Sequence, residues 1–351
     1  MKIISKIVYR SVSKETFAEH FEKLNNSASE HVIVTDTEMN NNAENGVLDD
    51  RITEEEVEKC IRCLKNNKAS GQDGILNEFL KHSGKDMVTI ITKLFNVVLN
   101  SGKMPNTWTT GYICPIFKGK GSTLDPDNYR GITIVSCFGK LFSSVLNRRI
   151  TTFLEVNNLL GQEQSGFRKG HSTLDHIFTL HCLIDAYLSR KKKLYCTFVD
   201  FRKAYDSIQR AYLWEKILNM GISGKVLNII KDMYDKTKLC VKHLNSYSQY
   251  FVSNLGLLQG ENLSPILFSM FLNDLKATIL SSNNIKLNNL ADVADIMGAE
   301  QLELYMYMFL LLYADDTAIL AENATDMQNA LTSLEQYCNR WGLHTCKCGQ
   351  N

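Results

Sequence analysis

An apolar segment interrupted by two adjacent carboxylates constrains the fold of this 351-residue chain more than any other feature. The apolar run Leu304–Ala314 leads into Asp315 and Asp316, after which Thr317–Leu320 resumes a strand-like pattern. The run covers about 11 residues, and roughly 20 are needed to cross a bilayer, so a buried strand is the better interpretation. The pattern predicts a tight β-hairpin with its acids at the tip. A polar hairpin turn without further function explains these two acids equally well, because aspartate tolerates turn geometry.

A third carboxylate follows a second predicted strand. The segment Leu194–Asp200, LYCTFVD, is rich in β-branched and aromatic residues and ends just before a helix-forming stretch. Three carboxylates at the ends of two apolar strands can converge on one place. Mg²⁺ prefers oxygen ligands and is usually held by one or two carboxylates together with substrate phosphates. The three acids therefore suit a site for metal-dependent nucleotide chemistry.

The order of the motifs resembles that of one enzyme family. The chain is similar to the successive palm motifs of reverse transcriptases at FVDFRKAYDSI (198–208), GLLQGENLSPILFSMFLNDL (256–275) and LLYADD (311–316). Upstream, it resembles the fingers of non-LTR, LINE-type retrotransposon polymerases in segments 50–81, 108–150 and 163–180. The likeness covers roughly residues 50–343.

The resemblance implies an α+β fold of the right-hand polymerase type. Its fingers would consist of helices and a hairpin, and its palm would be an antiparallel sheet backed by helices. The expected division is a polar linker at 1–50, fingers at 51–193, a palm at 194–343 that includes a fingers-region part near 210–255, and a divergent end at 344–351. Because the family pattern fails after Leu343, we expect the thumb to be missing.

The resemblance also implies a reaction and its cofactor. Asp200, Asp315 and Asp316 would be the catalytic acids and, with the Phe201 carbonyl, would hold two Mg²⁺, for which Mn²⁺ is a possible substitute. One ion would activate the primer 3′-hydroxyl and the other would steady the pyrophosphate. The implied function is RNA-directed DNA polymerase in retrotransposition. Its partners would be an RNA template, a DNA primer or target, and deoxynucleoside triphosphates.

Five residues match family positions beside the incoming nucleotide. Strands predicted at 111–118 and 129–136 place Lys118 and Arg130 on one hairpin, where the planar guanidinium would hold phosphate oxygens. Tyr205 matches the aromatic that excludes a 2′-hydroxyl, with packing at a helix start as the alternative. Gln259 would touch the nucleotide, and Gly260 would let the template base approach.

A second element is similar to a family segment that lies near the template. Gln164, Gly166, Phe167 and Arg168 match its Q-x-G-F-R pattern, and the last three are candidates for template binding. The alternative is a buried glycine turn with a surface arginine.

The chain departs from the family pattern at three positions near the expected nucleotide-binding site. Leu258 and Glu261 replace residues that are often Arg and Cys, and this puts nucleotide affinity in doubt. Gly131 stands where many relatives have Pro, which we expect to be tolerated.

Charge is distributed unevenly along the chain. The net charge is only +1, but residues 110–242 contain 21 Lys and Arg against 11 Asp and Glu. The rest of the chain is correspondingly acidic. A basic middle section of this kind is typical of a nucleic-acid contact surface.

The ten cysteines are expected to be reduced thiols, because the N-terminus carries no apolar signal segment. The sequence thus predicts an intracellular protein of the nucleus or cytoplasm that is neither secreted nor bound to a membrane. Cys60 and Cys63 form a C-x-x-C without a second pair that would complete a zinc site. Cys60 lies on the apolar face of a predicted helix, so core packing is favoured.

A function from another class remains open at this point. A truncated, catalytically defective retrotransposon relic would keep the fold and a basic groove for nucleic acid. The three intact acids argue against long decay, whereas the divergent end predicts a poor polymerase that still binds nucleic acid in a salt-sensitive way.

Overall fold

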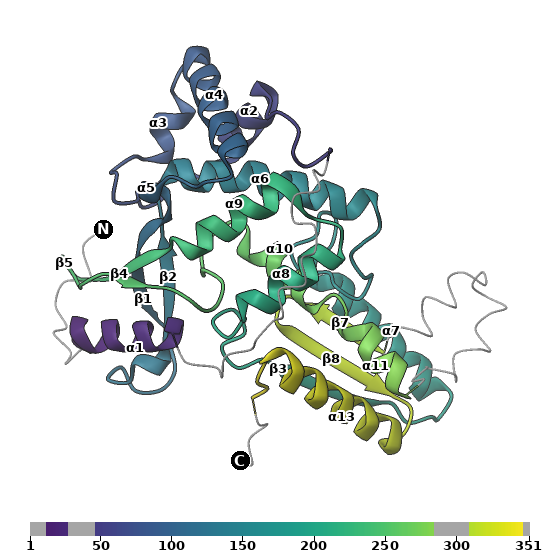
Figure 1. Cartoon of the computed structure of the whole chain (residues 1–351). Coiled ribbons are helices and arrows are strands. Elements are labelled where there is room, and N and C mark those ends of the chain that lie inside the picture. Colours follow the sequence, from purple (N-terminus) through teal and green to yellow (C-terminus); the bar gives the residue numbers. More distant parts are fainter. Residues whose placement is uncertain (1–11, 27–45, 284–308, 347–351) are drawn as a thin grey trace. The chain divides into compact units, whose positions relative to one another are not determined.

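The computed structural model describes residues 12–26, 46–283 and 309–346 of the chain (Figure 1). These residues combine helices with separate β-sheets, so the predicted α+β class is confirmed. The chain divides into a first unit, residues 1–153 and 217–264, and a second unit, residues 154–216 and 265–351. Each unit has its own sheet.

The sheet of the first unit is built around a hairpin. β1 (Thr110–Phe117) and β2 (Tyr129–Ile134) pair antiparallel, within two residues of the predicted strand ends. β4 (Lys238–His243) lies parallel to β1, and β5 (Ser246–Tyr247) and β6 (Phe251–Val252) both pair with β4. Because β1 is central, it fixes the position of the hairpin relative to the rest of this unit.

One helix of the first unit, α2 (Glu54–Cys63), starts at a clear local sequence signal. The Thr53 hydroxyl accepts a hydrogen bond from the Glu56 amide, and the Glu56 carboxylate accepts one from the Thr53 amide, which together form a capping box. Cys60 is buried on the inner face of the helix that follows, as predicted. The helices that lie wholly or partly in this unit are α1 (Lys14–Asn26), α2 (Glu54–Cys63), α3 (Asn77–Lys81), α4 (Lys85–Ser101), α5 (Asn106–Thr109), η1 (Pro126–Asn128), α6 (Cys137–Val156), α8 (Arg210–Asn219) and α9 (Gly224–Asp235). α6 ends in the second unit, and α8 begins in the second unit and ends in the first.

The N-terminal fifty residues, expected to be a polar linker, include a packed helix. α1 buries Phe17 and Phe21 completely or nearly so. The Phe17 ring lies 4.8 Å from the Tyr129 ring and 5.3 Å from the His243 ring, centroid to centroid. The linker expectation is therefore wrong for α1, which packs on the sheet of the first unit.

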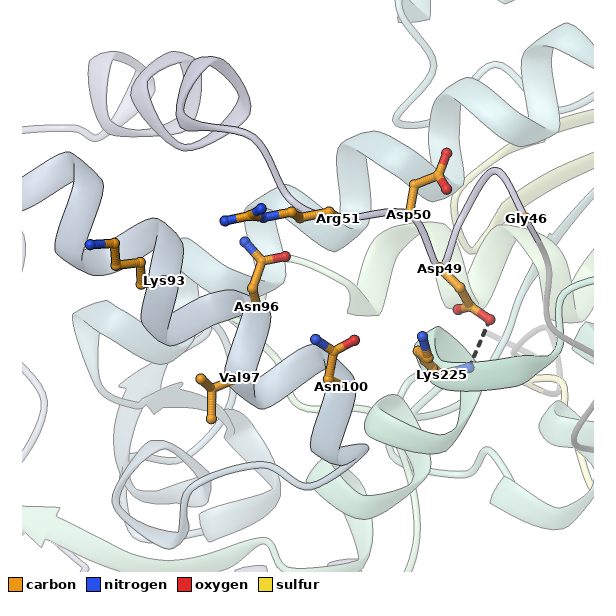
Figure 2. Close-up of a pocket in the computed structure, with 9 residues that line it drawn as sticks. All are labelled: Gly46, Asp49, Asp50, Arg51, Lys93, Asn96, Val97, Asn100 and Lys225. Atoms are coloured by element: carbon orange, nitrogen blue, oxygen red, sulfur yellow. Dashed lines mark hydrogen bonds between the residues drawn. The ribbon is translucent and has the colours of Figure 1, made fainter.

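Asp49, also within the expected linker, holds the start of α9. Its two carboxylate oxygens accept hydrogen bonds from the amides of Lys225 (3.0 Å) and Val226 (2.9 Å). Figure 2 shows the Asp49 carboxylate directed at the Lys225 amide. A carboxylate at a helix N-terminus satisfies free amides and complements the helix dipole.

The second unit contains, within its described residues, an antiparallel sheet in the order β3 (Tyr195–Asp200), β8 (Asp316–Ala321), β7 (Leu310–Tyr313). One face of β3 meets α13 (Ala324–Trp341), where Thr197 contacts Met327 at 3.3 Å. No helix in the described parts of the chain is long and apolar enough to cross a membrane. The elements are β3 (Tyr195–Asp200), β7 (Leu310–Tyr313), β8 (Asp316–Ala321), α7 (Thr173–Ser189), α10 (Ser264–Leu272), α11 (Leu275–Asn283) and α13 (Ala324–Trp341).

A buried lysine ties the helices of the second unit together. Lys216 Nζ lies 2.6 Å from Asp274 Oδ1 and 2.7 Å from the Tyr337 hydroxyl, and it sits 4.1 Å above the Trp341 ring. Burial lowers the pKa of Lys216 to about 8, although the Asp274 carboxylate acts in the opposite direction. The ammonium is kept in the core by one counter-ion and by aromatic faces.

Candidate active site

The acidic hairpin forms as the sequence predicts. Tyr313 and Asp316 are cross-strand partners, so Ala314 and Asp315 make a two-residue turn between β7 and β8. Ala314 has a φ of +58°, a left-handed conformation that is uncommon outside glycine. Such a conformation costs on the order of 1 kcal/mol and persists only where surrounding contacts impose it.

Asp200 and Asp316 face each other across the neighbouring strands. They are direct register partners at the ends of β3 and β8, and both are exposed. Directly opposite residues have Cβ atoms about 4.5–5.5 Å apart, and like charges in that arrangement are destabilising. The third acid is Asp315 in the adjoining turn, where it is partly exposed. The fold therefore gathers the predicted acids at one end of one sheet.

The three carboxylates do not form a ready-made metal-binding cluster. Within the described ranges, no three His, Cys, Asp or Glu side chains are placed to hold one ion. Asp315 lies in the turn and Asp316 is the first residue of β8, so only Asp316 is a register partner of Asp200. The pair Asp200 and Asp316 still fits Mg²⁺, because that ion commonly uses one or two carboxylates together with substrate phosphates. Metal binding by all three acids stays a prediction.

The backbone around Asp200 is held by the residues expected to diverge. Phe201 is buried and pairs with Thr345 in an isolated antiparallel bridge. The Cys346 amide donates a 2.8 Å hydrogen bond to the Asp200 carbonyl. Residues 344–346 therefore belong to the environment of the acid. Metal ligation by the Phe201 carbonyl stays a prediction.

Tyr205 packs on a helix and feels the charge of the acidic turn. Its ring stacks on Phe268 of α10, with centroids 4.7 Å apart and planes 15° apart. Burial raises the pKa of Tyr205, and the Asp315 carboxylate raises it further. The packing alternative is therefore observed, and the same ring lies close to a candidate catalytic acid. Exclusion of a 2′-hydroxyl stays a prediction.

The Q-x-G-F-R element is more buried than its expected template role requires. Gly166 is buried, whereas Phe167 is 55% exposed. The Arg168 guanidinium pairs with Glu155 through two contacts of 3.0 and 2.8 Å, and the residue is 9% exposed. A template contact by Arg168 would have to break this pair, so Phe167 is the better placed of the three for such a contact.

Lys118 and Arg130 lie on the hairpin of the first unit, as predicted. Both are exposed, and Arg130 is the register partner of Ile116 in β1. Lys118 Nζ donates a 2.6 Å hydrogen bond to the Asp127 carbonyl, which leaves the ammonium two further donors. Their placement on one hairpin agrees with a phosphate-binding role, which stays a prediction.

The Gln259–Gly260 turn packs on the same hairpin. The Gln259 carbonyl accepts a 2.7 Å hydrogen bond from the Thr133 amide. Gly260 has a φ of +103°, and an added Cβ would lie 2.9 Å from the Thr133 carbonyl oxygen. Only glycine therefore fits at this position, for a reason internal to the fold.

Glu261 does not present a carboxylate to solvent. The residue is 5% exposed, and one of its carboxylate oxygens accepts a 2.6 Å hydrogen bond from the Leu263 amide. Burial raises the pKa of Glu261, whereas Ser143, nearby amides and the Lys140 ammonium act in the opposite direction. The burial of Glu261 therefore does not support the expectation that its carboxylate lowers the affinity for the nucleotide.

A basic pocket adjoins Gly260 in the first unit. It has a volume of about 660 Å³ and is bounded by α2, the loop after it, β2 and α6. Its cationic side chains are Lys65, Lys68, Lys140 and Arg148, and no carboxylate lines it among the described residues. Sequence reasoning missed this pocket, because Lys65 and Lys68 of the loop after α2 meet Lys140 and Arg148 of α6 only in the folded chain.

A second hollow of the first unit, which we call the polar groove, is electrostatically different. It has a volume of about 620 Å³ and is shown in Figure 2. Arg51, Lys93 and Lys225 line it together with Asp49 and Asp50. Because the carboxylates offset most of the positive charge, the basic pocket is the better candidate for a polyanion.

Comparison with known families decides the class of protein. Residues 118–347 match the family described as "Reverse transcriptase (RNA-dependent DNA polymerase)". The chain belongs to the reverse transcriptase family. The hairpin acids, Lys118, Arg130 and the Gln259–Gly260 turn all lie within the matched range.

Several named relatives of this reverse transcriptase come from mobile elements. The probable RNA-directed DNA polymerase from transposon BS of Drosophila melanogaster is 28% identical over 295 residues, which cover 82% of this chain and 30% of that protein. The RNA-directed DNA polymerase from mobile element jockey of Drosophila funebris is 25% identical over 339 residues, 94% of this chain and 35% of that protein. The Pol polyprotein from type-1 retrotransposable element R2 of Nasonia vitripennis is 23% identical over 292 residues, 83% of this chain and 26% of that protein.

These relatives confirm the resemblance to non-LTR, LINE-type reverse transcriptases. They do not favour the alternative of a relic that has lost its enzymatic class. The chain spans about a third of the length of these relatives. Members of the family generally use divalent metal ions, which agrees with the oxygen ligands at the acidic hairpin.

Proposed function

We propose that this reverse transcriptase domain carries out RNA-directed DNA synthesis, in which deoxynucleotides are added to a primer 3′-end. The observation that carries the proposal is the direct pairing of Asp200 with Asp316 beside the turn that holds Asp315. Two opposed carboxylates of like charge are stabilised when a cation binds between them and substrate phosphates.

Mg²⁺ is the cation that these oxygen ligands suit best, and Mn²⁺ would substitute for it on the same chemistry. Asp200, Asp315 and Asp316 would hold it. When bound, two such ions would activate the primer hydroxyl and neutralise the pyrophosphate leaving group. The carboxylates contribute by fixing the position of the primer end, because a displacement of about 1 Å can reduce the rate roughly 100-fold.

The remaining residues would bind and select the nucleotide. Lys118 and Arg130 would neutralise the triphosphate, and the arginine fork would also fix its orientation. Tyr205, held against Phe268, would present a rigid ring edge to the sugar. A rigid ring rejects an additional hydroxyl better than a mobile one, so deoxynucleotides would be preferred over ribonucleotides.

The basic pocket would bind the phosphates of the nucleic-acid substrate. Four cations around one hollow, without an opposing carboxylate among the described residues, form a site for a polyanion rather than for a small neutral ligand. Its lining includes Gly260, which adjoins the Gln259 turn. The same turn would therefore contact both the nucleotide and the strand that pairs with it.

Single-nucleotide incorporation tests the proposed function. The full chain is mixed with an RNA template, a labelled DNA primer and one complementary deoxynucleotide, with Mg²⁺ or with chelator. Mg²⁺-dependent extension by one nucleotide that disappears in Asp200→Asn supports the proposal. Extension that survives this substitution, or that needs no divalent ion, refutes it.

A further inference from the structure

The segment before the Q-x-G-F-R arginine extends the sheet of the second unit. The Leu312 amide donates a 2.8 Å hydrogen bond to the Glu163 carbonyl, and the Ser165 amide donates a 2.9 Å bond to the Leu312 carbonyl. Gln164 and Leu312 are thereby parallel bridge partners. Residues 163–165 therefore lie beside β7, the strand that leads into the acidic turn, although the two segments are about 150 positions apart in the sequence.

Gln164 makes the decisive contact with that turn. Its Oε1 accepts a hydrogen bond from the Gly166 amide at 2.8 Å and another from the Ala314 amide at 3.1 Å. Ala314 is the turn residue with a φ of +58°. One buried carbonyl oxygen therefore ties the Q-x-G-F-R element to the strained residue that precedes Asp315.

Gly166 brings the two segments close enough for this bond. An added Cβ on Gly166 would lie 2.3 Å from the Ala314 nitrogen, a separation that no real side chain tolerates. The Arg168 pair with Glu155 anchors the other end of the element. The glycine is thus required for the approach to Ala314, not for freedom of its own backbone.

The amide of Gln164 is used for its oxygen only. The residue is 2% exposed, and its Nε2 finds no hydrogen-bond partner among the described residues. A buried polar group without a partner is costly, by roughly 1–3 kcal/mol. Burial also means that the side chain does not reach a nucleic-acid substrate, so direct template recognition does not explain the residue.

We infer that Gln164 is a positioning residue of the polymerase site. Its Oε1 fixes the Ala314 turn in the left-handed conformation and so sets where Asp315 and Asp316 point. The inference rests on the proposed function for its effect on catalysis, but the contact itself is independent of it. Backbone strain of this kind is kept at functional sites when neighbouring groups impose it.

Two substitutions test the role of the Gln164 Oε1 atom separately from that of the rest of the side chain. Gln164→Glu keeps an acceptor oxygen and replaces only the unpartnered amino group, so it should keep the contact, although burial of a carboxyl lowers overall stability. Gln164→Met removes the acceptor but keeps the length of the side chain. The matched control is Gln162→Met, because Gln162 is an exposed glutamine two residues upstream.

The first readout is amide hydrogen exchange at Ala314, which needs no enzymatic activity. Loss of the Oε1 bond in Gln164→Met should speed exchange at Ala314 by about fivefold or more, while Gln164→Glu and Gln162→Met leave it unchanged. Unchanged exchange at Ala314 in Gln164→Met overturns the inference. If Gln164→Met does not fold, Gly166→Ala replaces it, since its new Cβ displaces Ala314 while Gln164 is kept.

The second readout is single-nucleotide incorporation in the full chain. Gln164→Met should lower kcat by about 10- to 100-fold with little change in the KM of the deoxynucleotide, because only the acids move. An equal loss in Gln164→Glu, or a loss confined to KM, contradicts positioning through Oε1. If the wild type incorporates nothing, the proposed function fails, and the exchange measurement still decides whether Gln164 holds the turn.

Discussion

Phe21 of α1 occupies the space that a side chain at Gly131 of β2 would need. An added Cβ on Gly131 would lie 2.6 Å from Phe21 Cε1. The glycine that departs from the family pattern is thus matched by an aromatic residue more than a hundred positions upstream. Because Gly131 follows Arg130, this contact links α1 to the hairpin that carries the proposed phosphate ligands.

We therefore predict that Gly131→Ala destabilises the first unit by about 1–3 kcal/mol, the usual range for an overpacked core site. It should also raise the KM of the deoxynucleotide through displacement of Arg130. Urea unfolding and incorporation kinetics measure the two effects. Adding Phe21→Leu to Gly131→Ala should partly restore the stability and the KM of the wild type. Adding Glu22→Ala, at an exposed position, should restore neither the stability nor the KM. Failure of Phe21→Leu to compensate would show that the contact is not the cause.

A second prediction concerns the facing carboxylates. Asp200→Asn should abolish incorporation, yet the metal-free protein should become more stable by roughly 0.2–1 kcal/mol, because a like-charge cross-strand pair is removed. Thermal unfolding in chelator, compared with unfolding in Mg²⁺, measures this. Asp185→Asn on the exposed side of α7 serves as the control. A variant that is both inactive and less stable would indicate a structural role for Asp200 instead.

The third prediction tests the tyrosine ring. Tyr205→Ala removes the surface held against Phe268, so incorporation of ribonucleotides should rise relative to deoxynucleotides. Tyr205→Phe keeps the ring and should keep the wild-type ratio. Competition between the two nucleotide types in one reaction gives the ratio directly. If Tyr205→Ala leaves it unchanged, the ring is only part of the α10 packing.

The fourth prediction follows from the buried lysine. The pKa of Lys216 is lowered from 10.5 to about 8 in the folded protein, so between these values the unfolded chain binds a proton that the folded chain has released. This contribution to stability therefore rises with pH through that window and is constant below it. Between pH 7.5 and 9.5 it should add about 2 kcal/mol to the free energy of unfolding.

Other groups titrate in the same range with the opposite sign, so the measurement must be a difference. Burial raises the pKa of Cys60 and Cys338 to about 11, and such thiols lose stability as pH rises. Urea unfolding of the wild type and of Lys216→Met at both pH values isolates the lysine. The free energy of unfolding of the wild type minus that of Lys216→Met should increase by about 2 kcal/mol from pH 7.5 to pH 9.5. A difference in the free energy of unfolding that is independent of pH would mean that Lys216 keeps an ordinary pKa.

The fifth prediction distinguishes the two hollows of the first unit. Lys68→Gln in the basic pocket should weaken nucleic-acid binding and flatten the log–log dependence of affinity on salt by about 0.7 to 0.9. Lys93→Gln in the polar groove removes the same charge beside two carboxylates and should change the slope little. Fluorescence anisotropy at several salt concentrations gives both slopes. Equal changes in the two variants would show that only net charge matters.

Features that depend on neighbours in sequence were predictable. The turn at Asp315 and the strand that ends at Asp200 follow from local alternation and from residues that favour turns. Their pairing through Asp316 follows once both strands are placed in one sheet. The hairpin that carries Lys118 and Arg130 was predictable for the same reason.

Features that depend on partners distant in the sequence were not predictable. Phe17 and Phe21 lie in a segment whose polar composition resembles a linker, and their burial requires β2 and β4. Glu261 changes from an expected surface charge to a buried group because Leu263 and Lys140 surround it. Gln164 carries no local signal for its contact with Ala314, since only the folded sheet brings these distant residues within hydrogen-bond distance.

The bridge between Phe201 and Thr345 has a practical consequence for anyone shortening the protein. It covers backbone groups at the end of β3, and the Cys346 amide adds a further bond there. An uncovered edge of a sheet presents unpaired backbone groups, which recruit strands from other molecules. A version cut after Leu343 should therefore precipitate or form soluble aggregates, whereas one that keeps Cys346 should stay dispersed at the same concentration.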